Sequence, residues 1–108
     1  MVFIETPVFS GIRTNYWDDD EYRLFQTYLM LVPTVGQVIR GTGGLRKIRW
    51  RASGRGKRGG VRVIYYWLGG KSRFYLMTMY AKNEVTDLTP AQRSALKGIL
   101  QEWKDEQA

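Results

Sequence analysis

Cations are the residues of this chain best suited to chemistry, and they gather in the stretch 51-RASGRGKRGGVR-62. The stretch holds no acid and five cations, which are Arg51, Arg55, Lys57, Arg58 and Arg62. A guanidinium group donates paired hydrogen bonds to a phosphate and stabilises negative charge that builds on phosphoryl oxygens. The stretch therefore favours the binding of phosphate groups and chemistry on them.

A second group of cations precedes it, in the segment 45-LRKIRWRA-52. The alternation of this segment predicts a β-strand with two unlike faces. The cations that share one predicted face are Lys47, Arg49 and Arg51. Like charges on one face repel one another, so we expect a negative partner to lie against them. A carboxylate from elsewhere in the fold is the alternative to an external polyanion.

The charge of the whole chain indicates the same partner. The sequence has 17 basic and 10 acidic residues, a formal net charge of +7. No acid lies between Glu21 and Glu84, whereas cations continue throughout that interval. We therefore expect one positive face on the folded domain and a nucleic acid as its partner. A solvated basic surface with no partner is the alternative.

The residue types that are missing exclude several classes of enzyme. Because the sequence has no cysteine and no histidine, it has no disulfide, no cysteine or histidine metal ligand and no Ser-His-Asp arrangement. Helix capping explains the carboxylates of 18-DDDE-21, so no metal is expected there. A small-molecule cofactor is not expected either, because a dinucleotide motif that begins at Gly41 would need glycine where Arg46 stands, and no phosphate-loop GK[ST] follows at the required spacing. Lysine and tyrosine remain to exchange protons, and neighbouring cations are expected to lower the pKa of such groups.

The elements that must position these cations alternate between strand and helix patterns. Strands are predicted at 2–5, 45–52, 61–68 and 73–81, and helices at 18–33 and 89–108. The runs 61-VRVIYYWL-68 and 73-RFYLMTMYA-81 are apolar on both faces, which is typical of the centre of a sheet that is covered on each side. Arg62 stands in the first of these runs, where a rigid scaffold would hold it. The pattern predicts an α+β fold.

A single domain is expected over residues 1–108, because this length suits one core. No charged-then-apolar leader opens the sequence, and no apolar run is long enough to cross a membrane. These features predict a cytoplasmic protein that does not bind membranes.

Three motifs taken together resemble the RelE/HigB superfamily of bacterial toxin ribonucleases, and in particular its HigB-like branch. They are 41-GTGGLRKIR-49, 54-GRGKRGGVRVIYY-66 and 80-YAKNEVTDLTPAQ-92. With the first and last helices, the resemblance covers nearly the whole chain. It implies a small microbial-ribonuclease-like α+β fold, in which two helices lie beside an antiparallel sheet and another helix ends the chain.

The resemblance also implies an activity and its partners. Members of the family are ribosome-dependent, metal-independent endoribonucleases that inhibit translation by cutting mRNA in the A site of the 30S subunit, beside the 16S rRNA. The 2′-OH attacks the adjacent phosphate and leaves a 2′,3′-cyclic phosphate. A cognate antitoxin, typically a HigA-like protein with a helix-turn-helix, holds the enzyme inactive.

Carried over residue by residue, the resemblance implies that Arg62 stabilises the phosphate in the transition state. The proton acceptor stays open among Tyr80, Lys57 and Lys82, because Thr86 and Asp87 stand where the archetype has a tyrosine nearby. Asn83 replaces an arginine of the archetype. The RNA-binding residues that the resemblance implies are Lys47, Arg49, Arg51, Arg55, Arg58 and Asn83.

Two other functions stay open at this point. The first is a non-catalytic module that binds RNA or the ribosome, with Tyr65, Tyr66 and Trp67 as stacking platforms, although core packing suits these residues better. The second, a DNA-binding repressor, is weak because neither predicted helix is basic along one face. The loop over 52–60 is long for a hairpin connection, and we interpret it as a cationic flap that gains order against ribosomal or messenger RNA.

Overall fold

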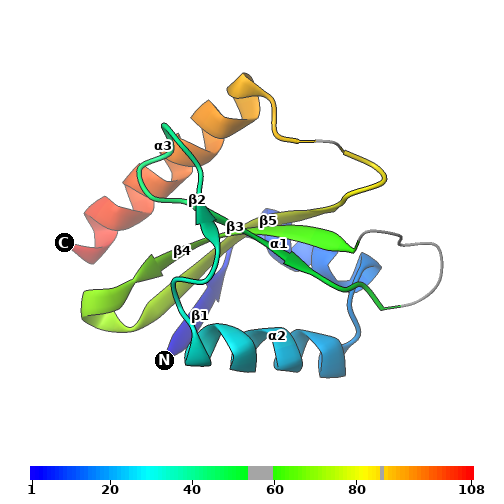
Figure 1. The fold of residues 1–108 in the computed structure, drawn as a ribbon. Helices are drawn as coiled ribbons and strands as arrows, with labels where there is room; N and C mark the ends of the chain where they lie inside the picture. Colours follow the sequence, from blue (N-terminus) through cyan, green and yellow to red (C-terminus); the bar gives the residue numbers. More distant parts are fainter. Residues whose placement is uncertain (54–59, 86) are drawn as a thin grey trace.

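The computed structural model describes residues 1–53, 60–85 and 87–108. Within these ranges the chain forms a five-stranded sheet with helices packed on both faces (Figure 1). The elements in chain order, with η for a 3₁₀ turn, are β1 Val2–Glu5, α1 Pro7–Ile12, η1 Arg13–Asn15, α2 Asp19–Leu31, β2 Gln37–Val38, β3 Arg46–Trp50, β4 Val61–Leu68, η2 Gly69–Lys71, β5 Arg73–Ala81 and α3 Pro90–Gln107. The predicted α+β fold class is confirmed.

Strands β4 and β5 occupy the middle of the sheet, whose strand order is β1-β5-β4-β3-β2. Both strands have the bounds that the apolar runs predicted, 61–68 and 73–81. They are joined through η2, and Ser72 at its end adopts a left-handed conformation with φ of 51°. Helices pack on both faces of these two strands, which explains why their sequences are apolar on both faces.

The sheet is mixed, because one of its edge strands runs parallel to its neighbour. Strand β1 runs parallel to β5, with Phe3 opposite Phe74, whereas the other three strand pairs are antiparallel. The chain between β1 and β5 passes through helices and further strands, and such a long crossover can return a strand in the parallel direction. The expectation of an antiparallel sheet therefore holds for three pairs and is wrong for this one.

Two short elements have no counterpart among the periodic patterns of the sequence. Helix α1 has six residues, and its N-cap is Thr6, whose hydroxyl accepts a hydrogen bond of 3.0 Å from the N–H of Phe9. Strand β2 pairs only Gln37 and Val38 with β3. Elements of this length are too short to show the period of a helix or a strand.

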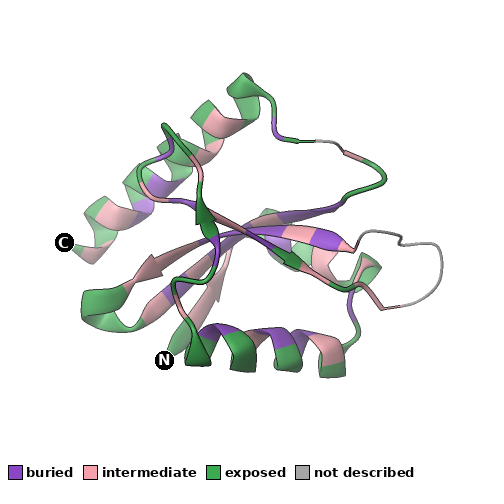
Figure 2. Cartoon of the chain, viewed as in Figure 1, coloured by how far each residue is buried: buried purple, intermediate pink, exposed green. Residues whose placement is uncertain are grey.

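Each face of the sheet carries its own hydrophobic core. Beneath α1 and α2 lie Phe9, Phe25, Val63 and other residues of the first core, while Ile64 and Leu100 belong to the second core beneath α3. Figure 2 shows buried residues along the sides of α2 and α3 that face the sheet. Successive residues of β4 thus point to opposite cores, as the pleat of a strand requires.

The two long helices begin at the capping residues that the sequence predicted. The Asp18 carboxylate accepts a hydrogen bond of 2.8 Å from the N–H of Glu21, and Thr89 with Gln92 forms the predicted capping box before α3. Helix α2 ends at Leu31, two residues before Pro33. No helix in the described ranges is both long enough and apolar enough to span a membrane.

Candidate nucleic-acid interface

Three of the predicted site residues lie side by side across three neighbouring strands. Arg49 of β3 is paired with Arg62 of β4, and Arg62 is paired with Tyr80 of β5. Directly paired residues of antiparallel strands project from the same face, and adjacent strands are about 4.8 Å apart. Two guanidinium groups and a phenol therefore form one line on the face that α3 partly covers. We call these three residues the Arg49–Arg62–Tyr80 row.

Lys47 is two residues before Arg49 on β3, so its side chain projects from the same face as the row. Its ammonium group is 3.4 Å from a carboxylate oxygen of Asp87, in the segment before α3. A hydrogen bond of 2.8 Å from the N–H of Leu88, together with nearby Lys47, lowers the pKa of Asp87 from its usual 3.8. Asp87 therefore neutralises part of the positive charge at this end of β3.

Arg49 differs from Lys47, because no acid of the described residues forms an ion pair with it. Its side chain is exposed, and it forms no ion pair with an acid in residues 1–53, 60–85 or 87–108. Arg62 is half-buried beside it. An exposed arginine next to a rigidly held one can donate hydrogen bonds to the same phosphate from two sides.

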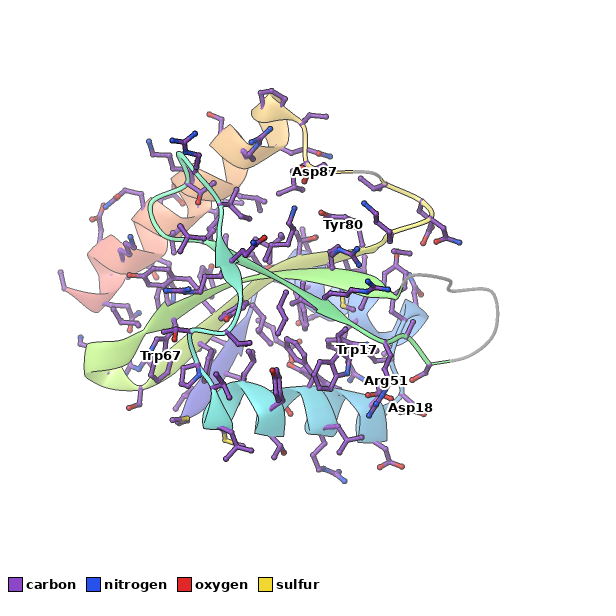
Figure 3. All side chains as sticks on the ribbon, viewed as in Figure 1. Trp17, Asp18, Arg51, Trp67, Tyr80 and Asp87 are labelled. Atoms are coloured by element: carbon purple, nitrogen blue, oxygen red, sulfur yellow. The ribbon has the colours of Figure 1, made fainter. Side chains whose placement is uncertain are left out.

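Arg51 leaves the face that the alternation predicted for it. Strand β3 ends at Trp50, and the Arg51 guanidinium donates to Glu21 of α2, with Nε at 2.9 Å from the nearer carboxylate oxygen. Trp17 holds the backbone of Arg51 by donating from its indole to the Arg51 carbonyl at 2.8 Å. Figure 3 shows Trp17, Asp18 and Arg51 together at the start of α2. The prediction that Arg51 shares a face with Lys47 and Arg49 is wrong, and its role in RNA binding stays a prediction.

Tyr80, at the β5 end of the row, is buried, and the surroundings of its hydroxyl are unusual. Only 7% of the residue is exposed, and its hydroxyl has no hydrogen-bond partner among the described residues. Burial raises the pKa of Tyr80 above 10.0, nearby Asp87 raises it further, and Arg62 opposes both. The expectation that neighbouring cations lower such a pKa is wrong for Tyr80, because burial outweighs the arginine. The raised pKa disfavours the phenolate form of Tyr80, which is the form that accepts a proton.

Lys82 and Asn83 follow directly after β5 and are exposed. The N–H of Lys82 donates to the carbonyl of Gly60 at 3.1 Å, which ties the end of β5 to the residue before β4. Gly60 has φ of 70°, and a Cβ at that position would lie 2.2 Å from the Trp50 carbonyl oxygen. The structure thus brings Lys82 close to the base of the 52–60 loop and to the strand that carries Arg62.

Three predicted site residues, Arg55, Lys57 and Arg58, lie outside the described residues. On the side of the loop that precedes them, Ser53 is bound to the segment before α2. Its N–H donates to the Tyr16 carbonyl at 2.8 Å, and its hydroxyl accepts from the N–H of Asp18 at 3.3 Å. Tyr16 in turn donates its hydroxyl to Glu84 at 3.1 Å. These anchoring contacts could not be predicted from the sequence, since nothing in the local pattern links residue 16 to residues 53 and 84.

The aromatic residues of β4 pack in or against the hydrophobic cores. Tyr65 is fully buried, donates to the Pro33 carbonyl at 2.9 Å and accepts from the N–H of Gly36 at 2.9 Å. Tyr66 packs edge-on against Trp103, and Trp67 packs on Phe74. These contacts leave Tyr65 without a face on which a nucleotide base could stack. Within the described residues, no group of three acidic, cysteine or histidine side chains could hold a metal ion.

Comparison with known proteins identifies the fold. No known family model matches the chain. Among solved structures, the chain is similar to a double arginine-to-alanine mutant of the E. coli toxin RelE in the free state, with a TM-score of 0.52 and 13% sequence identity. The similarity covers 79% of this chain and 86% of the RelE chain. The chain therefore has a RelE-like fold, as the resemblance of its motifs implied.

Proposed function

We propose that this protein is a toxin ribonuclease of the HigB-like branch, which inhibits translation by cutting mRNA. The observation that carries the proposal is the register of the Arg49–Arg62–Tyr80 row on a rigid sheet. The similarity of the fold to that of a toxin, RelE, supports it. A line of cations built into central strands suits a phosphodiester better than scattered surface charges would.

The proposed reaction is an attack by the RNA on itself. The 2′-oxygen forms a bond to the adjacent phosphorus, and the bond from phosphorus to the 5′-oxygen breaks, which leaves a 2′,3′-cyclic phosphate and a 5′-OH end. Negative charge grows on the two non-bridging oxygens during this step. In our proposal Arg62 donates to these oxygens from its fixed place in β4, and Arg49 donates from the exposed side of the row.

The reaction also needs a group to take the proton of the 2′-OH and one to protonate the leaving 5′-oxygen. Tyr80 is a poor candidate for the acceptor, because burial raises its pKa. Of the candidates from the sequence, Lys57 and Lys82 remain. The backbone bond between Lys82 and Gly60 keeps Lys82 near the strand that carries Arg62.

The proposed substrate and partners follow from the family resemblance. The substrate is mRNA in the ribosomal A site, with contacts to the 16S rRNA of the 30S subunit, and the location is the cytoplasm. Arg55, Lys57 and Arg58 of the loop would then add phosphate contacts. A HigA-like antitoxin with a helix-turn-helix would neutralise the protein.

Primer extension on a reporter mRNA in a bacterial translation extract tests this proposal. Wild-type protein should produce cuts within codons that vanish when an initiation inhibitor is added. Arg62→Ala should remove the cuts, whereas Arg23→Ala should keep them. Arg23 is the matched control because it is an exposed arginine on α2, its side chain 75% exposed, and α2 covers the other face of the sheet.

The same experiment separates an enzyme from a binding module. A binding module would slow translation without producing cuts, and its effect would weaken as salt is raised. Loss of one phosphate contact would then lower the salt dependence by about one unit of slope, equally for each cation. That result would overturn the proposed ribonuclease.

A further inference from the structure

A cavity of about 510 Å³ lies beside β5, next to Tyr80. Strand β1 pairs with β5 only as far as Leu76, and the chain then turns at Thr6 into α1. The later residues of β5 therefore have no neighbouring strand on that side, and α3 crosses above them. The cavity fills the space between this edge of β5, the start of α1 and the first half of α3.

The walls of the cavity are mostly apolar, and few polar groups reach it. Leu88, Ala95, Leu96 and Ile99 contribute apolar walls from the α3 side. Thr6 also lines the cavity, but its hydroxyl already donates to the Met77 carbonyl and accepts from the N–H of Phe9. An apolar cavity with a few polar groups that fix orientation is the usual form of a site for a small flat ligand.

Within the part of the chain that the structure describes, the hydroxyl of Tyr80 is a buried polar group without a hydrogen-bond partner. Tyr80 lines the cavity, is 7% exposed and has no hydrogen-bond partner among the described residues. Figure 3 shows Tyr80 rising from β5 toward the segment that carries Asp87. A buried hydroxyl without a partner is rare in folded proteins and calls for an explanation. A ligand that supplies the missing hydrogen bond provides one.

The position of Tyr80 indicates what that ligand is. Tyr80 is both the end of the Arg49–Arg62–Tyr80 row and a wall of the cavity. The Cα atoms of Arg49 and Tyr80 are two strand spacings apart, which is about 10 Å. A phosphate held by the two arginines would thus lie about one side chain away from the part of the cavity wall that Tyr80 forms. The part of a nucleotide that is flat, largely apolar on its faces and polar at its edge is the base.

We propose that this cavity binds one base of the RNA, next to the phosphate held by Arg49 and Arg62, and that the Tyr80 hydroxyl bonds to the edge of that base. The identity of the ligand rests on the proposed ribonuclease function. In this arrangement Tyr80 positions and selects the substrate and transfers no proton. An apolar side chain of a partner protein would fill the same walls, but it would leave the hydroxyl without a partner.

Binding of non-cleavable dinucleotides tests the cavity without any need for catalysis. The probes are the dinucleoside monophosphates with a 2′-O-methyl group at the attacking position. An abasic analogue, which has the same backbone and no base on either sugar, is measured beside them. Their affinity is measured by NMR titration at low salt against the wild-type protein. Ala95→Trp should fill the cavity, and Tyr80→Phe should remove only the hydroxyl. Ser94→Trp is the control, because Ser94 is an exposed neighbour on α3 that does not line the cavity.

The expected result is that Ala95→Trp weakens binding of the complete dinucleotides by roughly tenfold and leaves the abasic analogue unaffected. Tyr80→Phe should reduce the difference in affinity between bases by roughly three- to tenfold. Ser94→Trp should match the wild type. Equal affinities for all four proteins would overturn the proposal, and so would resonance shifts confined to the arginines. Capture of an apolar peptide in the cavity, with no dinucleotide binding, would also overturn it.

The outcome for the cavity can be separated from the outcome for the enzyme. If the extract shows cuts that depend on Arg62, but Ala95→Trp and Tyr80→Phe leave the bases at the cut sites unchanged, the cavity proposal fails and the ribonuclease stands. If the dinucleotides bind in the cavity and no cuts occur in the extract, the cavity proposal stands and the ribonuclease fails.

Discussion

Arg49 and Arg51 are two residues apart in sequence and meet opposite surroundings. Arg49 projects from the α3 face beside Arg62 and has no acidic partner in the described residues, whereas Arg51 is bound to Glu21 on the α2 side. Both belong to the same basic segment, and alternation assigns them to the same face. The end of the strand, here at Trp50, thus decides which cations stay available to a ligand.

The acids of the chain account for much of this difference. Glu21 accepts hydrogen bonds from both the Trp50 indole, at 2.8 Å, and the Arg51 guanidinium, and its side chain is only 15% exposed. Asp87 partly neutralises Lys47. Within the described residues, Arg49 on the α3 face thus keeps a positive charge that no acid neutralises by an ion pair.

The largest effect is expected at Arg62, which lies beside Arg49 on the α3 face. Arg62→Ala should reduce the single-turnover rate of mRNA cleavage by about 10²–10³, because the fixed donor to the phosphoryl oxygens is lost. Arg62→Lys should recover little of this rate, since an ammonium group cannot make the paired contact. Cleavage on programmed ribosomes measures both rates. A lysine variant at near wild-type rate would show that charge alone matters.

The comparison itself is tested by Arg49→Ala and Arg51→Ala. We expect Arg49→Ala to weaken RNA binding by about tenfold, as the loss of a charge-assisted contact to phosphate does. Arg51→Ala should change the affinity by less than about threefold, since Glu21 already binds that guanidinium. Fluorescence anisotropy with a labelled RNA measures the affinities. Equal losses would contradict the contrast between the two arginines.

Removal of the Glu21 carboxylate should release the Arg51 guanidinium, so that it can bind RNA as we expect Arg49 to do. Glu21→Ala leaves the Trp50 indole N–H without its acceptor, and we expect it to lower the free energy of unfolding by about 1–3 kcal/mol. Urea denaturation measures this loss. Glu21→Gln retains an acceptor for the indole, so it should be less destabilising, and it should raise RNA affinity by releasing Arg51. An unchanged affinity in the glutamine variant would indicate that Arg51 cannot reach the RNA.

The smallest effect is expected at Asp87, which is exposed. Its pKa is lowered in the folded protein, so its contribution to stability is present above its ordinary pKa of 3.8 and is lost as the pH falls below that value through the folded pKa. Asp87→Asn should remove this part of the acid dependence, a change of less than about 1 kcal/mol. Urea unfolding at several acidic pH values measures it. Identical pH profiles for the two proteins would rule out the contribution.

The fold was predictable from the sequence where patterns are long. The apolar runs of β4 and β5 and the capped helices α2 and α3 were found close to their true bounds. Helix α1 was not located, although Thr6 and Pro7 form a cap and a first position that could have indicated it. The parallel partner of β1 could not be read from the sequence, because pairing between strands distant in the chain depends on the whole topology.

The candidate site was predictable only as a set of residue types. Arg62 and Tyr80 were identified through the family resemblance, but their alignment with Arg49 depends on the register of three strands. That register includes an irregularity between Ile64 and Tyr65, where the pairing with β5 shifts. The partnership of Arg51 with Glu21 joins residues 30 apart in sequence, and it outweighs the local alternation that predicted the face of Arg51.

The central claim is that Arg62 contacts the phosphate that is cut. The most direct test is the cleavage rate of an mRNA with a single phosphorothioate, of either stereochemistry, at the cut position in the A site. With the wild type, we expect one stereoisomer to be cut more slowly than the other, because sulfur accepts hydrogen bonds weakly. With Arg62→Ala, that difference between the stereoisomers should disappear, since the two changes remove the same interaction. An undiminished difference in the variant would contradict the account.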